Sequence, residues 1–337
     1  MHKGYALAVV GAIAVVAVLA LSAQPGSVNL FSSEISTSEV AFMNYVTEYR
    51  KSYFNKEEYE FRYSIFRYNL EEAEKHNANP DRTYDQGINQ FSDLTEEEFS
   101  HYLGVVVPEE PQRGPVAEFD GDVAANSDWV AAGYVNAIKD QGSCGSCWAF
   151  SAVGAVESRY AVKHGKSSLM RLSEQELVDC SRSYGNNGCG GGWMDNAFNY
   201  DIAEKGEISE SSYPYHAKDE SCKKSGKAKN DKFTTHRSVS NSDSAVASAL
   251  SSGPISIAVY VNGNFQRYRS GIFSDNTCTR QVNHGVILTG AQDGYFNLRN
   301  SWGTSWGERG YMRISRSSTN PYGTCNCRQF ASYPDGF

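Results

Sequence analysis

The sequence predicts an α+β protein with a mainly helical N-terminal segment and a larger body. The 337 residues suffice for about two domains. Two amphipathic helical patterns lie over residues 34–53 and 56–77, and an apolar run typical of a buried helix begins at Trp148. The charge also divides the chain near residue 122, because the segment before it is acidic and the body is mildly basic.

The composition excludes several protein classes. Hydrophobic residues make up 40% and charged residues 21%, without a repeat or a low-complexity block, so the chain is neither disordered nor fibrous. The formal charge of −8 argues against a general nucleic-acid binder, whose affinity would come from Lys and Arg on phosphates. Eight cysteines allow several disulfides in an oxidising compartment.

Residues 1–23 are typical of a secretory signal peptide. Lys3 precedes an apolar run over residues 6–21, and small residues with Pro25 come after it. The alternative is an uncleaved membrane anchor, since 6–23 is within the length that spans a bilayer. Either interpretation brings the rest of the chain into the secretory pathway.

Residues 24–122 differ in charge from the C-terminal part of the chain. They hold 20 acidic and 8 basic residues, whereas residues 123–337 hold 19 acidic and 22 basic. This complementarity predicts that the acidic segment docks on the body, although an acidic face that only keeps the chain soluble is the alternative.

The acidic segment should be helical and end in a linker. The helix over 56–77 has a broad apolar stripe and stops before Pro80. A short helix should start at Asp93 or Thr95. The stretch 107–122 contains three prolines and is predicted to be an exposed, cleavable linker.

The body carries a candidate cysteine nucleophile. Cys147 comes after a glycine-rich turn and opens the apolar helix, where unpaired N–H groups and the helix dipole favour a thiolate. Cys144 and Cys147 could instead form a redox pair or half of a zinc site. The redox interpretation lacks a preceding βαβ strand, and the zinc interpretation lacks a second cluster with suitable spacing.

The block around Cys147 resembles the papain-like cysteine proteases. His284 lies 137 residues after Cys147 and Asn300 lies 153 after it, close to the family's spacing. Residues 188–192 are similar to the family's cleft segment, and 331–334 to its cathepsin L-type C-terminus. The acidic segment resembles the family's inhibitory propeptide through Glu58, Arg62, Phe66, Asn69, Asn77, Gly87, Asn89, Phe91 and Asp93.

The resemblance implies a zymogen with two lobes. It assigns residues 1–23 to the signal, 24–122 to an inhibitory propeptide and 123–337 to the mature peptidase. A helical lobe would carry Cys147, and a β-barrel-like lobe would carry His284 and Asn300, with the active-site cleft between them.

The resemblance also implies a role for each catalytic residue. Cys147 would attack the scissile carbonyl, and His284 would form an ion pair with it and protonate the leaving amine. Asn300 would orient the imidazole behind Trp302, and Gln141 would join the Cys147 N–H in the oxyanion hole. No cofactor or metal is expected.

Substrate contacts and specificity are implied in the same way. Phe330 would shorten the main specificity pocket, which predicts preference for a medium apolar side chain, such as Leu or Val, next to the cleavage site. The substrate-binding residues would be Gly145, Gly191, Gly192, Trp193, Met194, Ala258, Val282, Gly285, Trp302 and Phe330.

The resemblance implies three disulfides: Cys144–Cys189, Cys180–Cys222 and Cys278–Cys325. Cys327 is left over, in a position where the family usually has no cysteine. It is expected as a buried free thiol, with an intermolecular bridge or scrambling of Cys278–Cys325 as alternatives.

Taken together, these features predict a monomeric cysteine endopeptidase activated by propeptide removal at acidic pH. Its expected partners are protein and peptide substrates, its own propeptide and cystatin-type inhibitors, with no nucleic acid. Its expected place is a lysosome or vacuole, or outside the cell. Two alternatives are an inactive relative that serves as a binding scaffold and an inhibitor built from the propeptide alone.

Overall fold

The computed structural model describes residues 36–119 and 126–337. The expected signal at 1–23 and the expected start of the mature body at Val123 lie outside these residues. Within the described ranges, no helix is long and apolar enough to cross a bilayer.

The propeptide segment opens with two helices, α1 (Thr37–Glu48) and α2 (Lys56–Asn77). The second has the predicted bounds, and Asn55 caps it by accepting a hydrogen bond from the Glu58 N–H at 2.8 Å. The two helices enclose a small core of Phe42, Tyr45 and Phe66. Of the apolar stripe predicted for the second helix, Phe66 is buried in this core, whereas Tyr59 and Phe61 are exposed.

The first helix is shorter than the predicted range of 34–53. Arg50 lies just beyond it with a φ of +51°, a left-handed conformation that cannot continue a helix. The residues after it turn toward Asp93, whose carboxylate accepts hydrogen bonds from Lys51 Nζ at 2.7 Å and the Tyr53 hydroxyl at 2.9 Å. Tyr45 also donates to Asp93, at 2.6 Å.

A short third helix, α3 (Glu96–Ser100), begins just after Asp93. Thr95 and Glu98 form a capping box at its start, as the sequence favours. Glu98 also accepts two hydrogen bonds from the Arg62 guanidinium, at 2.6 and 2.7 Å. This pair fastens α3 to α2.

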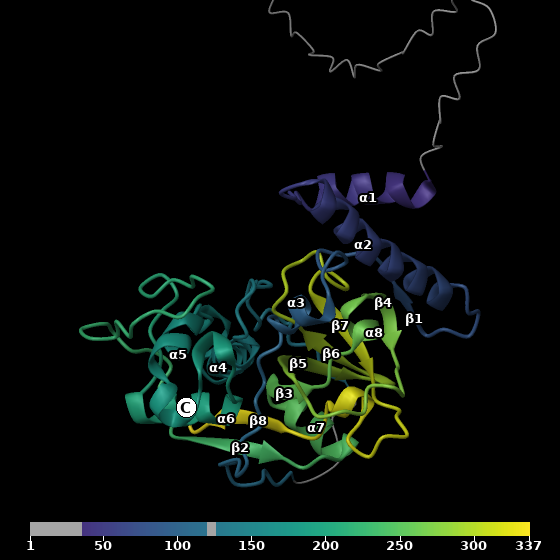
Figure 1. The fold of residues 1–337 in the computed structure, drawn as a ribbon. Helices are drawn as coiled ribbons and strands as arrows, with labels where there is room; N and C mark the ends of the chain where they lie inside the picture. The colour runs from purple at the N-terminus through teal and green to yellow at the C-terminus, as the bar shows by residue number, and fades with distance from the viewer. Residues whose placement is uncertain (1–35, 120–125) are drawn as a thin grey trace, which may run out of the picture. The chain divides into compact units, whose positions relative to one another are not determined.

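One eight-stranded sheet runs in the order β1-β4-β7-β6-β5-β3-β8-β2 (Figure 1). The propeptide supplies its first strand, since Tyr84 pairs with Gly271 of β4. The strands are β1 (Tyr84–Gln86), β2 (Thr235–Val239), β3 (Ile255–Val259), β4 (Tyr268–Phe273), β5 (His284–Gln292), β6 (Tyr295–Arg299), β7 (Tyr311–Ser315) and β8 (Ala331–Asp335).

Helices of the body gather mainly on one side of this sheet, around α4 (Figure 1). One hydrophobic core lies among these helices and a second among the strands. The helices are α4 (Cys147–His164), α5 (Glu174–Cys180), α6 (Met194–Glu204), α7 (Asp243–Ser251) and α8 (Gly263–Gln266), and the short 3-10 turns are η1 (Lys166–Ser168), η2 (Arg182–Tyr184), η3 (Gly188–Gly190) and η4 (Thr324–Asn326).

A buried ion cluster ties the helical lobe together. Lys139 Nζ lies 2.7 Å from a Glu157 carboxylate oxygen on α4 and 2.5 Å from one of Glu174 on α5. All three side chains are buried, so each charge depends on the others for compensation.

The order of helices and strands confirms the predicted α+β class and the mainly helical N-terminal segment.

Candidate active site

Cys147 is the first residue of α4. The helix is apolar on nearly every side, and Trp148, Ala152 and Val156 are fully buried, so α4 is held rigidly in the core. At its N-terminus the backbone N–H groups have no partner within the helix, which favours negative charge on the sulfur. The sequence pattern places Cys147 at this position correctly.

His284 and Asn300 are brought together by two neighbouring strands. His284 opens β5, and Asn300 comes directly after β6, while Ile287 pairs with Arg299 across the two strands. His284 Nε2 lies 2.8 Å from Asn300 Oδ1. The structure therefore places an amide where it fixes the imidazole ring.

The imidazole is enclosed but retains a free nitrogen. The ring centroids of His284 and Trp302 are 4.5 Å apart, and both residues are buried. Within the described chain, His284 Nδ1 has no hydrogen-bond partner. This nitrogen is available for proton exchange with a thiol. Burial lowers the pKa of His284 to about 4, although the Asn300 hydrogen bond acts in the opposite direction.

Gly285 brings the histidine strand against the start of α4. A Cβ atom there would lie 3.0 Å from the Cys147 carbonyl oxygen, so the two backbones are in close contact. Burial raises the pKa of the Cys147 thiol to about 11, and the backbone N–H groups of Gly285 and Gly104 oppose this increase.

Gln141 stands before the same helix and is held by both sides of the site. Its Oε1 accepts a hydrogen bond from Ser301 Oγ at 2.7 Å, beside Asn300. Its Nε2 donates to the carbonyl oxygens of Cys144 and Tyr102, both at 2.9 Å. Tyr102 lies in the segment 24–122 that is expected to be the propeptide, so a carbonyl of this segment occupies the donor.

The propeptide also covers the sulfur. Gly104 donates its backbone N–H to Cys147 Sγ at 3.2 Å. A Cβ atom at Gly104 would lie only 1.8 Å from the Gly145 carbonyl oxygen, so only glycine fits this approach. Sequence reasoning missed Gly104, because a single glycine before an expected linker carries no distinguishing signal.

The residues just after Gly104 connect the two lobes. The Val105 N–H donates to the Asn283 carbonyl at 3.1 Å, and the Val106 N–H donates to the Gly192 carbonyl at 3.0 Å. The Gly192 N–H returns a bond to the Gly104 carbonyl at 2.8 Å. The segment 102–106 therefore bridges the two lobes through main-chain hydrogen bonds.

Val105 occupies an apolar site formed by expected substrate-binding residues. It is 8% exposed and belongs to one core cluster with Trp193, Met194, Ala258 and Val282. Phe330 packs beside them, with its ring centroid 5.2 Å from that of Trp193. Gly145 and Gly191 line the same segment: a Cβ on Gly145 would approach the Leu103 carbonyl, and one on Gly191 would approach Val106.

Three disulfides are present, and they join the three pairs that the resemblance implies: Cys144–Cys189, Cys180–Cys222 and Cys278–Cys325. Cys147 and Cys327 are free and buried. Burial raises the pKa of Cys327 to about 12. Cys144 is thus bound in a disulfide and forms neither a redox pair nor a zinc site with Cys147. No cluster of three or more His, Cys, Asp or Glu residues suited to a metal ion occurs in the described ranges.

Comparison with known families covers both parts of the chain. The family described as "Papain family cysteine protease" matches residues 123–335. The family described as "Cathepsin propeptide inhibitor domain (I29)" matches residues 42–99.

Individual relatives agree with these matches. The chain is 42% identical over 340 residues to "Probable cysteine protease RD21C" of Arabidopsis thaliana, covering 96% of this chain and 74% of the relative. It is 40% identical to "Cathepsin L 1" of Paramecium tetraurelia, covering 86% of this chain and 91% of that protein. The solved structure of a recombinant stem bromelain precursor matches with a TM-score of 0.82 at 36% identity, covering 89% of this chain and 99% of that one.

Proposed function

Because this chain belongs to the papain family of cysteine proteases and carries an inhibitory propeptide, we propose that it cleaves peptide bonds through Cys147, His284 and Asn300. The observation that carries the proposal is the 2.8 Å contact between His284 Nε2 and Asn300 Oδ1, which leaves Nδ1 without a partner among the described residues, while the next residue, Gly285, lies against the Cys147 backbone. A neutral amide can orient the ring without adding charge to a thiolate–imidazolium pair.

These positions define a sequence of chemical steps. His284 takes the Cys147 proton, and the thiolate attacks the carbonyl carbon to form a tetrahedral intermediate. Its oxyanion accepts hydrogen bonds from Gln141 Nε2 and the Cys147 N–H. His284 then protonates the leaving amine as the C–N bond breaks, which leaves a thioester. Water attacks this thioester with His284 as base, and the thiol and a carboxylic acid are released.

The propeptide suppresses this chemistry by contacting the oxyanion donor and the nucleophilic sulfur. Tyr102 engages the oxyanion donor Gln141, and Gly104 covers Cys147 Sγ. Burial raises the pKa of Cys147 and lowers that of His284, which disfavours the thiolate–imidazolium pair while the segment containing Gly104 lies on the sulfur. Removal of the propeptide hydrates the pair and allows it to ionise.

Acid is proposed to release the propeptide through its own carboxylates. Protonation reduces its net negative charge, which weakens the attraction to the mildly basic body. The Arg62–Glu98 pair inside the propeptide supports a local contribution: the Arg62 guanidinium lowers the pKa of Glu98 to about 2, so the pairing of α3 with α2 weakens only as the pH falls from 4.5 toward 2.

A medium apolar side chain is proposed to be preferred at P2, the second residue on the N-terminal side of the scissile bond. Val105 of the propeptide fills the site beside Met194, Ala258 and Val282, which supports a Val- or Leu-sized occupant. A peptide library that favoured Arg or Phe there would contradict this preference.

Proteolytic processing and cellular localisation are proposed from the sequence. We assign residues 1–23 to the signal, 24–122 to the propeptide and 123–337 to the mature enzyme, which acts as a monomer. Entry into the secretory pathway, with a final place in a lysosome or vacuole or outside the cell, fits the apolar N-terminal run. Cystatin-type proteins are the proposed inhibitors.

A matched pair of cysteine variants tests the nucleophile. Cys147→Ala and Cys327→Ala each remove a buried free thiol. After acid treatment, Cys147→Ala should show no hydrolysis of a fluorogenic peptide with Leu at P2, whereas Cys327→Ala should retain it. Equal loss in both variants, or activity in Cys147→Ala, would exclude Cys147 as the nucleophile.

A further inference from the structure

The linker forms a β-bridge with the outer edge of the sheet. β2 is the last strand in the sheet order, and Val116 pairs with its Ser238 in parallel. The Ser238 N–H donates to the Pro115 carbonyl at 3.0 Å, and the Ala117 N–H donates to the Ser238 carbonyl at 2.8 Å. Main-chain pairing of this kind is how sheet edges bind extended peptides.

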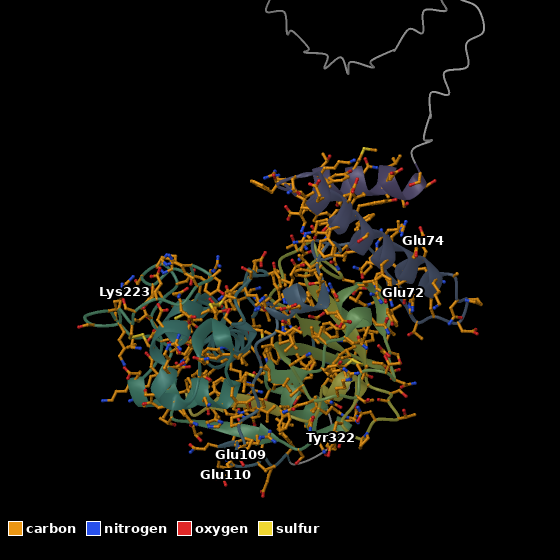
Figure 2. The ribbon with its side chains drawn as sticks, in the orientation of Figure 1. Glu72, Glu74, Glu109, Glu110, Lys223 and Tyr322 are labelled. Atoms are coloured by element: carbon orange, nitrogen blue, oxygen red, sulfur yellow. A yellow bond between two sulfur atoms is a disulfide. The ribbon has the colours of Figure 1, made fainter. Side chains whose placement is uncertain are left out.

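The predicted exposed linker is therefore only partly exposed. Glu109 and Glu110 point away from the body in Figure 2, and both are exposed. Gly114, in contrast, is partly covered, and its carbonyl accepts a hydrogen bond from Ser238 Oγ at 2.8 Å. Proline content predicted the extended backbone but could not show that it pairs with β2.

Arg113 inserts into a site that suits a guanidinium group. Its Nη2 donates to the Ala331 carbonyl at 2.8 Å, and its Nε lies 3.9 Å from Asp195 Oδ2. Its guanidinium carbon lies 5.7 Å from the centre of the Phe330 ring. A carbonyl, a carboxylate and an aromatic ring thus converge on one cation, which is a pattern typical of arginine recognition.

Asp195 is the buried carboxylate of this site. It is 1% exposed, and Ser332 Oγ donates to its Oδ1. Among the described residues its Oδ2 has no hydrogen-bond partner. The other basic neighbour is His236, whose pKa is lowered by burial, although Asp195 opposes that effect. Burial raises the pKa of Asp195, and His236, the Ser332 hydrogen bond and Arg113 all oppose this increase, so Arg113 adds favourable positive charge beside a buried carboxylate.

The position after the arginine accepts only glycine. A Cβ atom on Gly114 would lie 2.1 Å from the His236 carbonyl oxygen and 2.9 Å from His236 Nδ1. Such a contact with backbone cannot be relieved by a side-chain movement. The surface therefore selects an arginine, then a glycine, in an extended chain. We call it the Arg-Gly site, formed by Asp195, Phe330, Ala331 and Ser238.

We propose that the Arg-Gly site, once vacated by the propeptide, binds an extended segment of a protein substrate that contains Arg followed by Gly. The inference rests on the proposed function because the site is vacated only when activation removes the linker. Phe330 joins the site to the proposed specificity pocket through its contact with Trp193, so a segment bound there lies beside the cleft. Binding at a second site raises the local concentration of the scissile segment.

The test uses the full chain with Cys147→Ser, in which residues 113–117 are replaced by a Gly-Ser sequence of equal length. The probe is a fluorescein-labelled peptide with the sequence of residues 111–118, Pro-Gln-Arg-Gly-Pro-Val-Ala-Glu. Fluorescence anisotropy should show saturable binding of this peptide to the chain with the replaced linker, here called the replaced chain. The chain with its own linker should bind at least about tenfold more weakly, because Arg113 already fills the site.

Two control peptides test the chemistry. Citrulline in place of the arginine keeps the shape but removes the charge, and alanine in place of the glycine adds the excluded Cβ. Each should bind at least about tenfold more weakly. Equal binding of the citrulline peptide, or no binding of the parent peptide to the replaced chain, would overturn the proposal.

Two protein variants locate the site. In the replaced chain, Asp195→Asn and Phe330→Leu should each weaken binding of the arginine peptide more than that of the citrulline peptide. Thermal unfolding measured in parallel identifies a variant that has not folded, and Phe330→Leu keeps the test decisive if Asp195→Asn unfolds. Because no hydrolysis is measured, the outcome is independent of whether Cys147 is the nucleophile.

Discussion

The backbone N–H of Gly104 donates a hydrogen bond to Cys147 Sγ at 3.2 Å, which places the propeptide directly on the nucleophile. The contact is possible because Gly104 has no side chain to collide with Gly145. We therefore expect inhibition to depend on the close backbone approach of Gly104 to Cys147.

Gly104→Ala should weaken this inhibition. The new Cβ would lie 1.8 Å from the Gly145 carbonyl oxygen, so the segment must move away from the sulfur. We expect alkylation of Cys147 in the uncut zymogen to be at least about tenfold faster than in the unmodified chain. Glu109→Gln, in the exposed part of the linker, is the matched control and should leave the rate unchanged. An unchanged rate in Gly104→Ala would contradict this mode of inhibition.

Asn300→Ala should lower activity by loosening the imidazole. The 2.8 Å contact to His284 Nε2 would be lost, and a misplaced catalytic group costs up to about 100-fold in rate. We expect kcat to fall about 10- to 100-fold with a smaller change in KM, together with a shifted acid limb of the pH–rate profile. A loss confined to KM would show that Asn300 acts in substrate binding instead.

Gln141→Ala should remove one oxyanion donor. Loss of such a donor typically costs about 10²–10³ in kcat, or roughly 3–4 kcal/mol. The same change should also loosen the propeptide, because Gln141 Nε2 donates to the Tyr102 carbonyl. Steady-state kinetics on the activated enzyme and propeptide binding should both change, and unchanged kcat would remove Gln141 from the mechanism.

The Arg62–Glu98 pair should contribute a pH-dependent part of propeptide stability. The Arg62 guanidinium lowers the pKa of Glu98 from its ordinary 4.5 to about 2. A depressed carboxyl pKa stabilises the fold fully above pH 4.5, and this stabilisation is lost as the pH falls toward 2.

Glu98→Gln removes this titrating group. Propeptide release, monitored by size-exclusion chromatography, should be faster than in the unmodified chain at pH 6, and the difference should shrink as the pH falls below 4.5. Glu60→Gln, exposed on α2, serves as the control. An unaltered pH dependence of release in Glu98→Gln would contradict this role.

Lys139→Met should destabilise the helical lobe. It leaves the Glu157 and Glu174 carboxylates buried without their shared cation, and breaking such a cluster costs about 3–5 kcal/mol. Urea unfolding should detect the loss, whereas Lys163→Met, an exposed change near the end of α4, should have little effect. A stability equal to that of the unmodified chain would show that the cluster is dispensable.

The sequence predicts local features of this fold better than long-range contacts. The bounds of α2 are explained by its apolar stripe and its Asn55 cap, and α3 by its capping box at Thr95. The end of α1 is not explained locally, because the turn at Arg50 is held by the distant Asp93 network.

In the candidate site, too, local features are predicted better than long-range contacts. The positions of Cys147, His284 and Asn300 are predicted by motif and spacing, and the structure brings His284 into contact with Asn300. The role of Tyr102 and the insertion of Arg113 depend on which segment lies against which lobe. That register is set by packing between residues far apart in sequence, which a local pattern does not encode.

The central claim is that Cys147 is a nucleophile that becomes reactive only when the propeptide leaves. The most direct measurement is labelling with an epoxide-type thiol reagent after incubation of the precursor at pH 4.5 and at pH 7, with mass spectrometry to locate the label and the new N-terminus. We expect label on Cys147 only in chains cut near Val123 at pH 4.5. Equal labelling of the intact precursor at pH 7, or no label in correctly cut and folded enzyme, would contradict the claim.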